Sequence, residues 1–411
     1  MKLKILIFLT AIATTYGWQA EAQTYDTNNE VVQTFAGSAF TGYLDGQGQL
    51  TMFSSPSLIV ADTSSNLFVW DSGNSRIRKI APDATVTTFA GGGVAATGIG
   101  TNVSLSYTMD SMTTDHSNAI WCVAYNGNFY LLRIGSDATI TRPATNLTGL
   151  AASGICFDSA NNLYYSAPNA NKIYRWFTNG TLEVFVGSGN SGSIDGNGVF
   201  TSFRLPGTLA CDSADNIYVW DAGNALIRRI NQNRDVVTIA GLHSGNFDGN
   251  GTNTGFNSIS DMRADNSGNI YLACGSSIRK MNAATNVVTM AGSFTQNAYT
   301  NGVGNLARFN TASGLCLSQG SIFVADSGNQ RIRQISFNPQ PQVVTGANLG
   351  IGTFAGITIT GTVGRTYQIQ SSPDLNTWTT RATLLLTSSP YLWIDQNPIA
   401  GNKFYQALLL P

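Results

Sequence analysis

The sequence predicts an all-β chain: a ring of six four-stranded sheets (a six-bladed β-propeller), followed by a small β-sandwich domain. Three observations predict the ring. An apolar strand recurs along the chain at a spacing of about 50 residues, a period typical of propeller blades. Each repeat contains short runs of β-branched or aromatic residues separated by Gly, Asn, Asp and Ser, which is the pattern of successive antiparallel strands. One phrase of the repeat is missing from the last copy and stands alone near the N-terminus.

The recurring strand aligns the repeats. Its copies are Leu67–Asp71, Ile120–Ala124, Leu163–Ala167, Ile217–Asp221, Ile270–Cys274 and Ile322–Asp326. No segment between these copies has sustained helical spacing. A four-stranded sheet of this kind cannot bury both of its faces alone, so neighbouring sheets must stack around an axis.

The displaced phrase reads Val-x-Thr-x-Ala-Gly. It closes several repeats, at Val86–Gly91, Val237–Gly241 and Val288–Gly292, with a looser copy at Val184–Gly187. The last repeat instead runs from Ile335 into a proline-containing linker, and a lone copy occupies Val32–Gly37. We therefore predict that an N-terminal strand completes the last sheet and closes the ring.

The whole repeat resembles the NHL repeat. The pattern Phe-x-x-Pro, then Asn-Ile-Tyr-Val-x-Asp-x-Gly-Asn-x-x-Ile-Arg-Lys-Ile and Val-x-Thr-x-Ala-Gly, is nearly complete in Phe53–Gly91 and Phe203–Gly241. The second and third copies depart from it, because Ala124 and Ala167 stand where the aspartate is expected. The resemblance covers residues 31–336 and implies an NHL-like propeller. It implies no single function, since such propellers serve as protein-binding, RNA-binding and catalytic scaffolds.

The recurring polar residues are expected to build the fold. An aspartate that ends the recurring strand can cap the amides of the next hairpin. The arginines that follow can bridge to these aspartates and to carbonyls between blades; they are Arg76, Arg78, Arg228, Arg279, Arg331 and Arg333.

Glycine-rich loops between the blades offer a second repeated pattern. They are Asp45–Gly48, Asp195–Gly198, Asp248–Gly251 and Asn301–Gly304. They lack the further carboxylates that fill the oxygen shell of calcium, so tight glycine turns are the favoured interpretation. No cofactor is expected, with structural calcium as the alternative.

Composition and the N-terminus indicate a secreted protein. Lys2 and Lys4 precede a short apolar run, and Ala20-Glu-Ala22 fits a cleavage site, so residues 1–22 are expected to be a signal peptide. The run is too short to span a membrane. With a net charge of −1 and no basic cluster, the chain has no basic surface for the phosphate backbone of a nucleic acid, and no such partner is expected. We expect an extracellular monomer, with the periplasm as the alternative location.

The cysteines do not form a disulfide pattern. They are spread singly through the repeats, at Cys122, Cys156, Cys211, Cys274 and Cys316. Each lies in an apolar strand, which predicts buried thiols that pack as small hydrophobic side chains.

The usual catalytic residues are scarce, and no catalytic residue is predicted. The chain has two histidines, His116 and His243, whereas catalytic zinc generally needs three protein ligands. Glu30 and Glu183 are placed outside the inner strands. The metal-binding candidates that remain are aspartates following inner strands, where turn formation is the favoured role: Asp62, Asp212 and Asp265.

Two functions follow from these observations. The favoured one is a non-catalytic binding or scaffold protein for an extracellular protein or glycan, with its ligand near the loop Gly91–Asn102 and the divergent second and third repeats. The alternative is a metal-dependent lyase or hydrolase with its site in the central channel.

The C-terminal part predicts a separate module. A linker is expected at residues 337–342, and a small β-sandwich at 343–411. The run from Tyr367 to Trp378 resembles C-terminal modules of secreted bacterial proteins, somewhat like fibronectin type III. Trp378, Tyr391 and Trp393 are expected in its core, with a sugar-stacking platform as the alternative.

Overall fold

The computed structural model describes residues 30–143, 152–243, 245–337, 356–359, 362–387, 391–394 and 404–410. The predicted signal peptide lies outside these residues. Contacts between Cα atoms divide the chain into two compact units, one formed by Tyr25–Pro339 and the other including Gln340–Pro411. Across the described residues the structure is all-β, with short 3-10 turns and no α-helix, and no helix there is long and apolar enough to cross a membrane.

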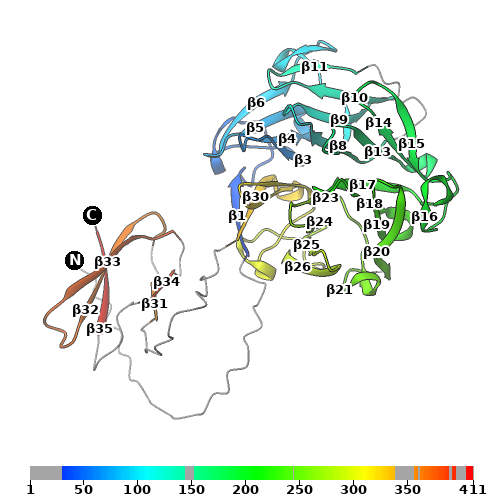
Figure 1. Ribbon diagram of the computed structural model, residues 1–411. Coiled ribbons are helices and arrows are strands. Elements are labelled where there is room, and N and C mark those ends of the chain that lie inside the picture. Colours follow the sequence, from blue (N-terminus) through cyan, green and yellow to red (C-terminus); the bar gives the residue numbers. More distant parts are fainter. Residues whose placement is uncertain are drawn as a thin grey trace. The chain divides into compact units, whose positions relative to one another are not determined.

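The first unit is built from antiparallel sheets, which we number in chain order (Figure 1). Sheet 1 consists of β3 (Pro56–Ala61), β4 (Leu67–Asp71), β5 (Arg76–Ile80) and β6 (Thr85–Gly91). Sheet 2 consists of β8 (Thr108–Thr114), β9 (Ile120–Tyr125), β10 (Phe129–Ile134) and β11 (Thr139–Thr141). Sheet 3 consists of β12 (Ile155–Phe157), β13 (Leu163–Ala167), β14 (Lys172–Trp176) and β15 (Leu182–Val186).

The second half of the unit repeats this plan. Sheet 4 consists of β17 (Pro206–Cys211), β18 (Ile217–Asp221), β19 (Leu226–Ile230) and β20 (Asp235–His243). Sheet 5 consists of β23 (Asp261–Ala264), β24 (Ile270–Cys274), β25 (Ser277–Met281) and β26 (Asn286–Gly292). Sheet 6 consists of β28 (Ala312–Ser318), β29 (Ser321–Asp326), β30 (Arg331–Phe337) and β1 (Glu30–Ala36).

Two-residue strands from the connections between sheets extend the outer edges. They are β2 (Gly46–Gln47), β7 (Gly98–Ile99), β16 (Gly196–Asn197), β21 (Gly249–Asn250) and β27 (Gly302–Val303), while β22 (Thr254–Gly255) pairs in parallel with β20. The predicted recurring strands are confirmed as β4, β9, β13, β18, β24 and β29, with ends that agree within one residue.

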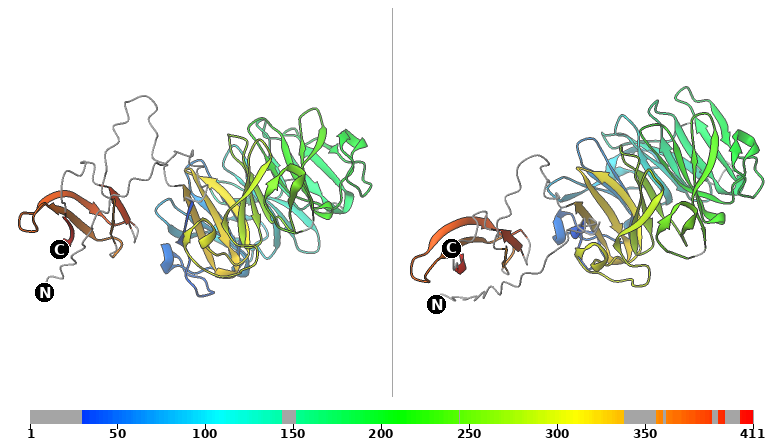
Figure 2. Two further views of the ribbon diagram at one scale, coloured as in Figure 1. Left: turned by 90° about the horizontal axis from the view of Figure 1, so that it is seen from below. Right: turned by 60° about the horizontal axis from the view of Figure 1, so that its bottom comes forward.

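The sheets of the first unit stack side by side, as the ribbons in Figure 2 show, and side chains from both faces of each sheet pack against the neighbouring sheets. Every residue of Leu67–Asp71 is buried, because one set of side chains faces each neighbour. Apolar clusters join sheet 1 to 2, 2 to 3, 3 to 4, 4 to 5 and 5 to 6, and a further cluster joins sheet 6 to sheet 1. The first strands contact one another in the same cyclic order, β3, β8, β12, β17, β23 and β28, and β28 contacts β3. This arrangement is that of a β-propeller.

The glycine of the Val-x-Thr-x-Ala-Gly phrase is required by a close backbone approach. Gly91 has φ +94°, and a Cβ there would lie 2.5 Å from the carbonyl oxygen of Ser75. Gly37 has φ +96°, and its Cβ would lie 2.5 Å from the carbonyl oxygen of Gln330. Gly37 therefore has the same relation to the hairpin of sheet 6 as Gly91 has to that of sheet 1. In keeping with this, β1 pairs antiparallel with β30, from Glu30 opposite Phe337 to Ala36 opposite Ile332.

The C-terminal unit contains two further antiparallel sheets. β31 (Gly356–Ile359) pairs with β34 (Tyr391–Ile394), and β32 (Thr366–Ser372) lies between β33 (Thr379–Leu385) and β35 (Phe404–Leu409). Tyr391 and Trp393 pack against a small buried cluster, as expected for core residues, while Trp378 is half-buried and donates to the carbonyl of Leu375.

Deleting Val31–Gly37 should expose the edge of β30 and abolish cooperative unfolding, because an unpaired edge strand promotes aggregation. A milder test replaces single residues of β1. Val32 is fully buried between sheets 5 and 6, whereas the next residue, Gln33, is exposed. Val32→Asp should lower the free energy of unfolding by at least about 3 kcal/mol in urea denaturation, and Gln33→Asp should change it by less than about 0.5 kcal/mol. Equal stability of the deletion variant and the parent would contradict the pairing of β1.

Candidate functional site

One end of the sheets carries both the hairpins after each second strand and the long connections between sheets; we call it the loop face. In sheet 1 the connection of residues 38–45 lies over the hairpin of residues 72–75, since Asn74 donates to the carbonyl of Gly42. Asn224 donates in the same way to Gly192 in sheet 4, and Asn329 to Ala298 in sheet 6. The connections are therefore held against the ends of the sheets.

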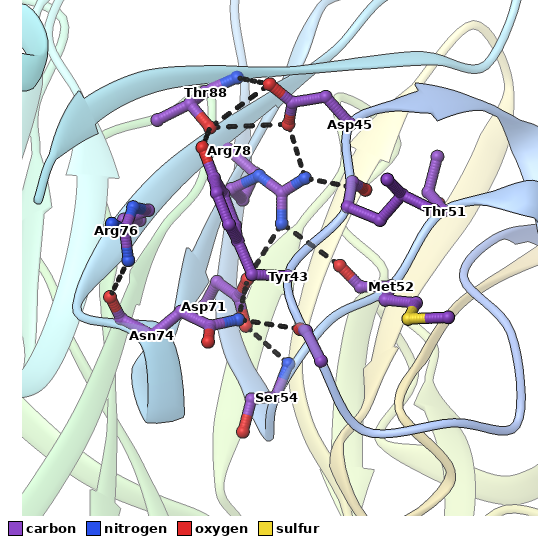
Figure 3. Close-up of polar contacts among 12 residues, drawn as sticks. Tyr43, Asp45, Thr51, Met52, Ser54, Asp71, Asn74, Arg76, Arg78 and Thr88 are labelled. Carbon is purple, nitrogen blue, oxygen red and sulfur yellow. Dashed lines mark hydrogen bonds and ion pairs between the residues drawn. The ribbon is translucent and has the colours of Figure 1, made fainter.

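A buried arginine fixes each of these connections, and we call the arginine with its partners an arginine clamp (Figure 3). The side chain of Arg78 is fully buried. It donates to Asp71 at 2.9 Å and to Asp45 at 2.5 Å, and also to the carbonyl oxygens of Met52 and Leu44. The carboxylate of Asp45 accepts the amide of Thr88 in the outer strand β6. One guanidinium thus joins the hairpin, the connection and the sheet.

The clamp recurs in three other sheets. Arg228 pairs with Asp221 and Asp195 at 3.0 and 2.6 Å, and Arg333 pairs with Asp326 at 2.7 Å. Asn301 takes the place of the loop aspartate in sheet 6, at 2.8 Å from Arg333. In sheet 5 the strand ends on a cysteine instead, and the arginine pairs with its loop aspartate alone: Arg279 with Asp248, at 3.0 Å. The predicted bridging role is confirmed for these four arginines, whereas Arg76 and Arg331 donate to carbonyls of their own hairpins.

The predicted role of the strand-ending aspartate needs a correction. Asp71 was expected to cap the amides of its own hairpin, but it forms no side-chain cap there. Its carboxylate instead accepts the amide of Ser54, just before β3, and the side chains of Asn74 and Arg78. Burial raises the pKa of Asp71, although these hydrogen bonds and the Arg78 charge oppose the shift. The aspartate is thus the buried anion of the clamp.

The loop aspartates are the residues of the glycine-rich loops considered for calcium. In Asp45 and in Asp195, one carboxylate oxygen accepts a hydrogen bond from the clamp arginine, and the other accepts one from the amide of a threonine in the outer strand. The glycine that follows each of these aspartates has a positive φ that other residues rarely adopt, +151° at Gly46 and +146° at Gly196. These geometries fit tight glycine turns.

Sheets 2 and 3, where the repeats diverge, have no clamp among the described residues. In the strand pairing, Leu132 of sheet 2 and Tyr174 of sheet 3 occupy the position that the clamp arginine has in the other sheets. Tyr174 stacks on Tyr165, with ring centroids 5.1 Å apart and planes 8° apart. The free space between the two sheets is about 10 Å³, room for one water. This interface is filled with side chains; residues 144–151 lie outside the described structure.

The candidate metal ligands Asp62, Asp212 and Asp265 lie at the opposite end of the sheets, which we call the turn face. Each follows the first strand of its sheet and accepts hydrogen bonds within its own turn. Asp62, for example, accepts the amides of Ser64 and Asn66 and the side chain of Asn66. The described residues contain no group of three His, Cys, Asp or Glu side chains placed to hold a metal ion. Metal binding by these aspartates stays a prediction.

The other residues singled out in the sequence are also placed. His116 is exposed in the corresponding turn of sheet 2, and the backbone of His243 ends β20. Glu183 lies in the outer strand β15, where it pairs with Arg175 at 2.5 Å and Arg234 at 3.1 Å. Glu30 opens β1. The structure brings none of these residues together.

The free cysteines confirm the prediction of buried thiols at four positions, with Cys211 half-buried. Burial raises the pKa of Cys122, Cys274 and Cys316 to about 12. The thiols are therefore protonated at neutral pH, which makes them poor nucleophiles.

Asp261 and Arg263, in the first strand of sheet 5, were missed by sequence reasoning. Their side chains pair at 2.7 Å, and Asp261 also accepts the amide of Leu315 in sheet 6. Arg263 donates to the carbonyl of Met112 in β8 at 3.2 Å. In the cyclic order of first strands β8 and β23 are separated by two strands on either side, so this guanidinium reaches across the central channel. The signal was present: Asp-Met-Arg places two charged residues in a strand expected to be apolar.

The clamp makes a matched test available in β19, where buried Arg228 is followed by exposed Arg229. Arg228→Ala leaves the buried carboxylate of Asp221 without its cation and should lower the free energy of unfolding by about 3–5 kcal/mol. Arg229→Ala should change it by less than about 0.5 kcal/mol. Chemical denaturation of both variants measures the difference, and a common denaturation midpoint would show that the clamp adds no stability.

Comparisons with known proteins bear on the fold. A family model described as NHL repeat matches residues 309–335, and no curated protein matches the sequence. The structure is similar to that of a protein of unknown function from Bacteroides thetaiotaomicron, with 19% identity and a TM-score of 0.61, over 75% of this chain and 76% of the other.

Two other solved structures show how widely this fold is used. One is an auxiliary nutrient binding protein from Bacteroides ovatus, with 16% identity and a TM-score of 0.59, over 76% of this chain and 78% of the other. Another is a gluconolactonase from Xanthomonas campestris, with 10% identity and a TM-score of 0.51, over 76% of this chain and 92% of the other. At these identities the similarities establish the β-propeller fold alone.

Proposed function

We propose that this chain is a secreted, non-catalytic binding protein, which presents the loop face of a six-bladed β-propeller to an extracellular protein or carbohydrate. The observation that carries the proposal is a set of large apolar side chains exposed on the connections of the loop face, most of them on connections that a clamp holds. Val94 is 99% exposed, Phe40 70%, Ile194 64% and Leu44 46%. Exposed apolar side chains of this kind are typical of interaction surfaces.

The arginine clamps hold the loops that carry these side chains against the sheets. The residue just before the loop aspartate is Leu44 in one connection and Ile194 in another, and its carbonyl oxygen accepts a hydrogen bond from the buried clamp arginine. The backbone is therefore fixed while the apolar side chain points into solvent. A preorganised loop loses little conformational entropy on binding, which favours affinity.

The ring in this proposal has six blades and is closed by β1, which supplies the fourth strand of sheet 6. The cluster that joins sheet 6 to sheet 1 and the pairing of β1 with β30 support this count. Signal-directed secretion, and a sandwich formed by the two C-terminal sheets, complete the proposal. The similarity to an auxiliary nutrient binding protein is compatible with a binding role outside the cell.

The binding role is favoured over a metal-dependent lyase or hydrolase in the channel by the pair of Asp261 and Arg263. The guanidinium of Arg263 extends across the channel to the carbonyl of Met112 and is ion-paired with Asp261, so both charged side chains are engaged with the protein itself. Stoichiometric zinc or calcium in the purified protein, removed by a chelator and located at the axis, would favour the enzyme instead.

The surface is tested with the full chain as bait, against secreted proteins of the source culture and against a glycan array. The captured partner should bind the double variant Leu44→Ser/Ile194→Ser at least about tenfold more weakly, since truncated interface anchors cost 1–2 kcal/mol each. The matched control is Leu50→Ser/Leu306→Ser, because these two side chains are at least as exposed but lie at the outer edge of the sheets. Failure to capture any protein or glycan, or equal weakening by both pairs, would overturn the proposal.

A further inference from the structure

The turn face carries a groove between sheets 5 and 6 that is separate from the loop face. Its volume is about 410 Å³, within the range of small-molecule sites. Apolar groups form part of its wall, from Tyr271 of sheet 5 and from Leu317, Ile322 and Phe337 of sheet 6. Asn266, Ser318 and Gln319 add polar groups.

The groove exists because the first hairpin of sheet 6 is shorter than its equivalents. In sheet 5, Ala264 pairs with Ile270 on either side of an Asp-to-Asn turn. In sheet 6, Leu317 pairs with Ile322, one residue closer in sequence, and Ser318 pairs directly with Ser321. The tight turn between these serines, with φ of +49° at Gln319 and +69° at Gly320, has no aspartate.

The missing turn also removes a hydrogen-bond acceptor. In sheets 1, 2 and 3, the amide that follows the turn aspartate donates to a side chain from the turn of the next sheet: Thr63 to Asn118, His116 to Asn161, and Ser159 to Asp215. The equivalent amide in sheet 5 belongs to Asn266, and the short hairpin of sheet 6 has no residue at the accepting position. Among the described residues, neither this amide nor the side chains of Asn266, Ser318 and Gln319 have a hydrogen-bond partner.

The charge of the groove indicates a neutral ligand. Asp265 is the one carboxylate in its wall, and four donors already satisfy it: the amides of Ser267 and Asn269, the side chain of Asn269 and the hydroxyl of Tyr271. Among the described residues that line the groove, no charged side chain is unpaired. Free amides and hydroxyls beside an apolar wall match a ligand that has both hydroxyl groups and a C–H face.

We propose that the groove between sheets 5 and 6 binds a neutral saccharide. The half-exposed ring of Phe337 supplies an aromatic surface for the C–H face of a sugar ring, and it is 41% exposed. Asn266 and Gln319 hydrogen-bond the sugar hydroxyls from the two sides of the groove. This site does not depend on the partner of the loop face, which lies at the other end of the sheets.

The probes are glucose, galactose, mannose, N-acetylglucosamine, maltose and cellobiose, titrated into the full chain and followed by saturation-transfer NMR and calorimetry. At least one should bind with a Kd on the order of 1 mM or tighter, the affinity expected of a sugar-sized ligand. Absence of binding by every sugar at 50-fold higher concentration (about 50 mM) would overturn the proposal.

Matched variants locate the bound sugar. Phe337→Ser and Asn266→Ala should each weaken binding at least about fivefold, in line with one lost contact of 1 kcal/mol or more. The controls are Phe200→Ser, an exposed phenylalanine of sheet 4, and Asn233→Ala, an exposed asparagine in another turn; both should leave Kd unchanged.

A third variant tests the site without changing Phe337 or Asn266, so that a loss of binding caused by instability of those two variants can be recognised. Grafting the sequence of Asp265–Asn269 in place of Ser318–Ser321 lengthens the hairpin over the groove and should abolish binding, while Leu44→Ser/Ile194→Ser should not affect it. Sugar binding that survives the graft would place the sugar elsewhere and refute the site. Loss of sugar binding in the loop-face double variant would likewise refute it, because the two surfaces lie at opposite ends of the sheets.

Discussion

The burial of an arginine at the end of a sheet is the interaction on which the loop face depends. A guanidinium removed from water is costly unless an anion and further acceptors surround it. Asp71 supplies the anion for Arg78, and the carbonyls of Met52 and Leu44 accept its remaining hydrogens. Because Asp71 ends a strand, whereas Leu44 and Met52 lie in the segment before β3, satisfying the arginine holds that segment against the sheet. The same charge therefore stabilises the sheet and positions a loop.

Sheets 2 and 3, which lack the arginine clamp, indicate the role that the clamp has in the other sheets. At the equivalent positions sheet 2 has Leu132 and sheet 3 has Tyr174, and both sheets keep their strand pairing. Apolar groups of similar size often replace a buried ion pair without loss of stability. In sheet 3 the stacked rings of Tyr165 and Tyr174 occupy this place. The clamp is therefore not needed to form a sheet; its particular role is to hold the connection in place.

Local patterns predicted the fold closely, and they failed where a side chain acts over a distance. The strand Leu67–Asp71 was predicted to the residue, because its apolar run and turn residues are local signals. The partner of Asp71 at Ser54 was missed, since the hydrogen bond joins residues far apart in sequence. The role of Arg263 was also missed because its partner is distant in sequence: its acceptor is Met112, in a strand on the other side of the ring. Repeat patterns describe each sheet alone and contain no information on contacts through the axis.

Departures from the repeat have different consequences according to where they fall. In the second and third strands of sheets 2 and 3 the substituted residues fill the space again, so the divergence leaves a packed interface with room for one water. In the first hairpin of sheet 6 the departure shortens the chain, and no neighbouring side chain can replace lost backbone. The groove beside Asn266 is the result. The substitutions in sheets 2 and 3 are thus compensated by packing, whereas the shortened turn of sheet 6 leaves a groove beside an unpaired amide.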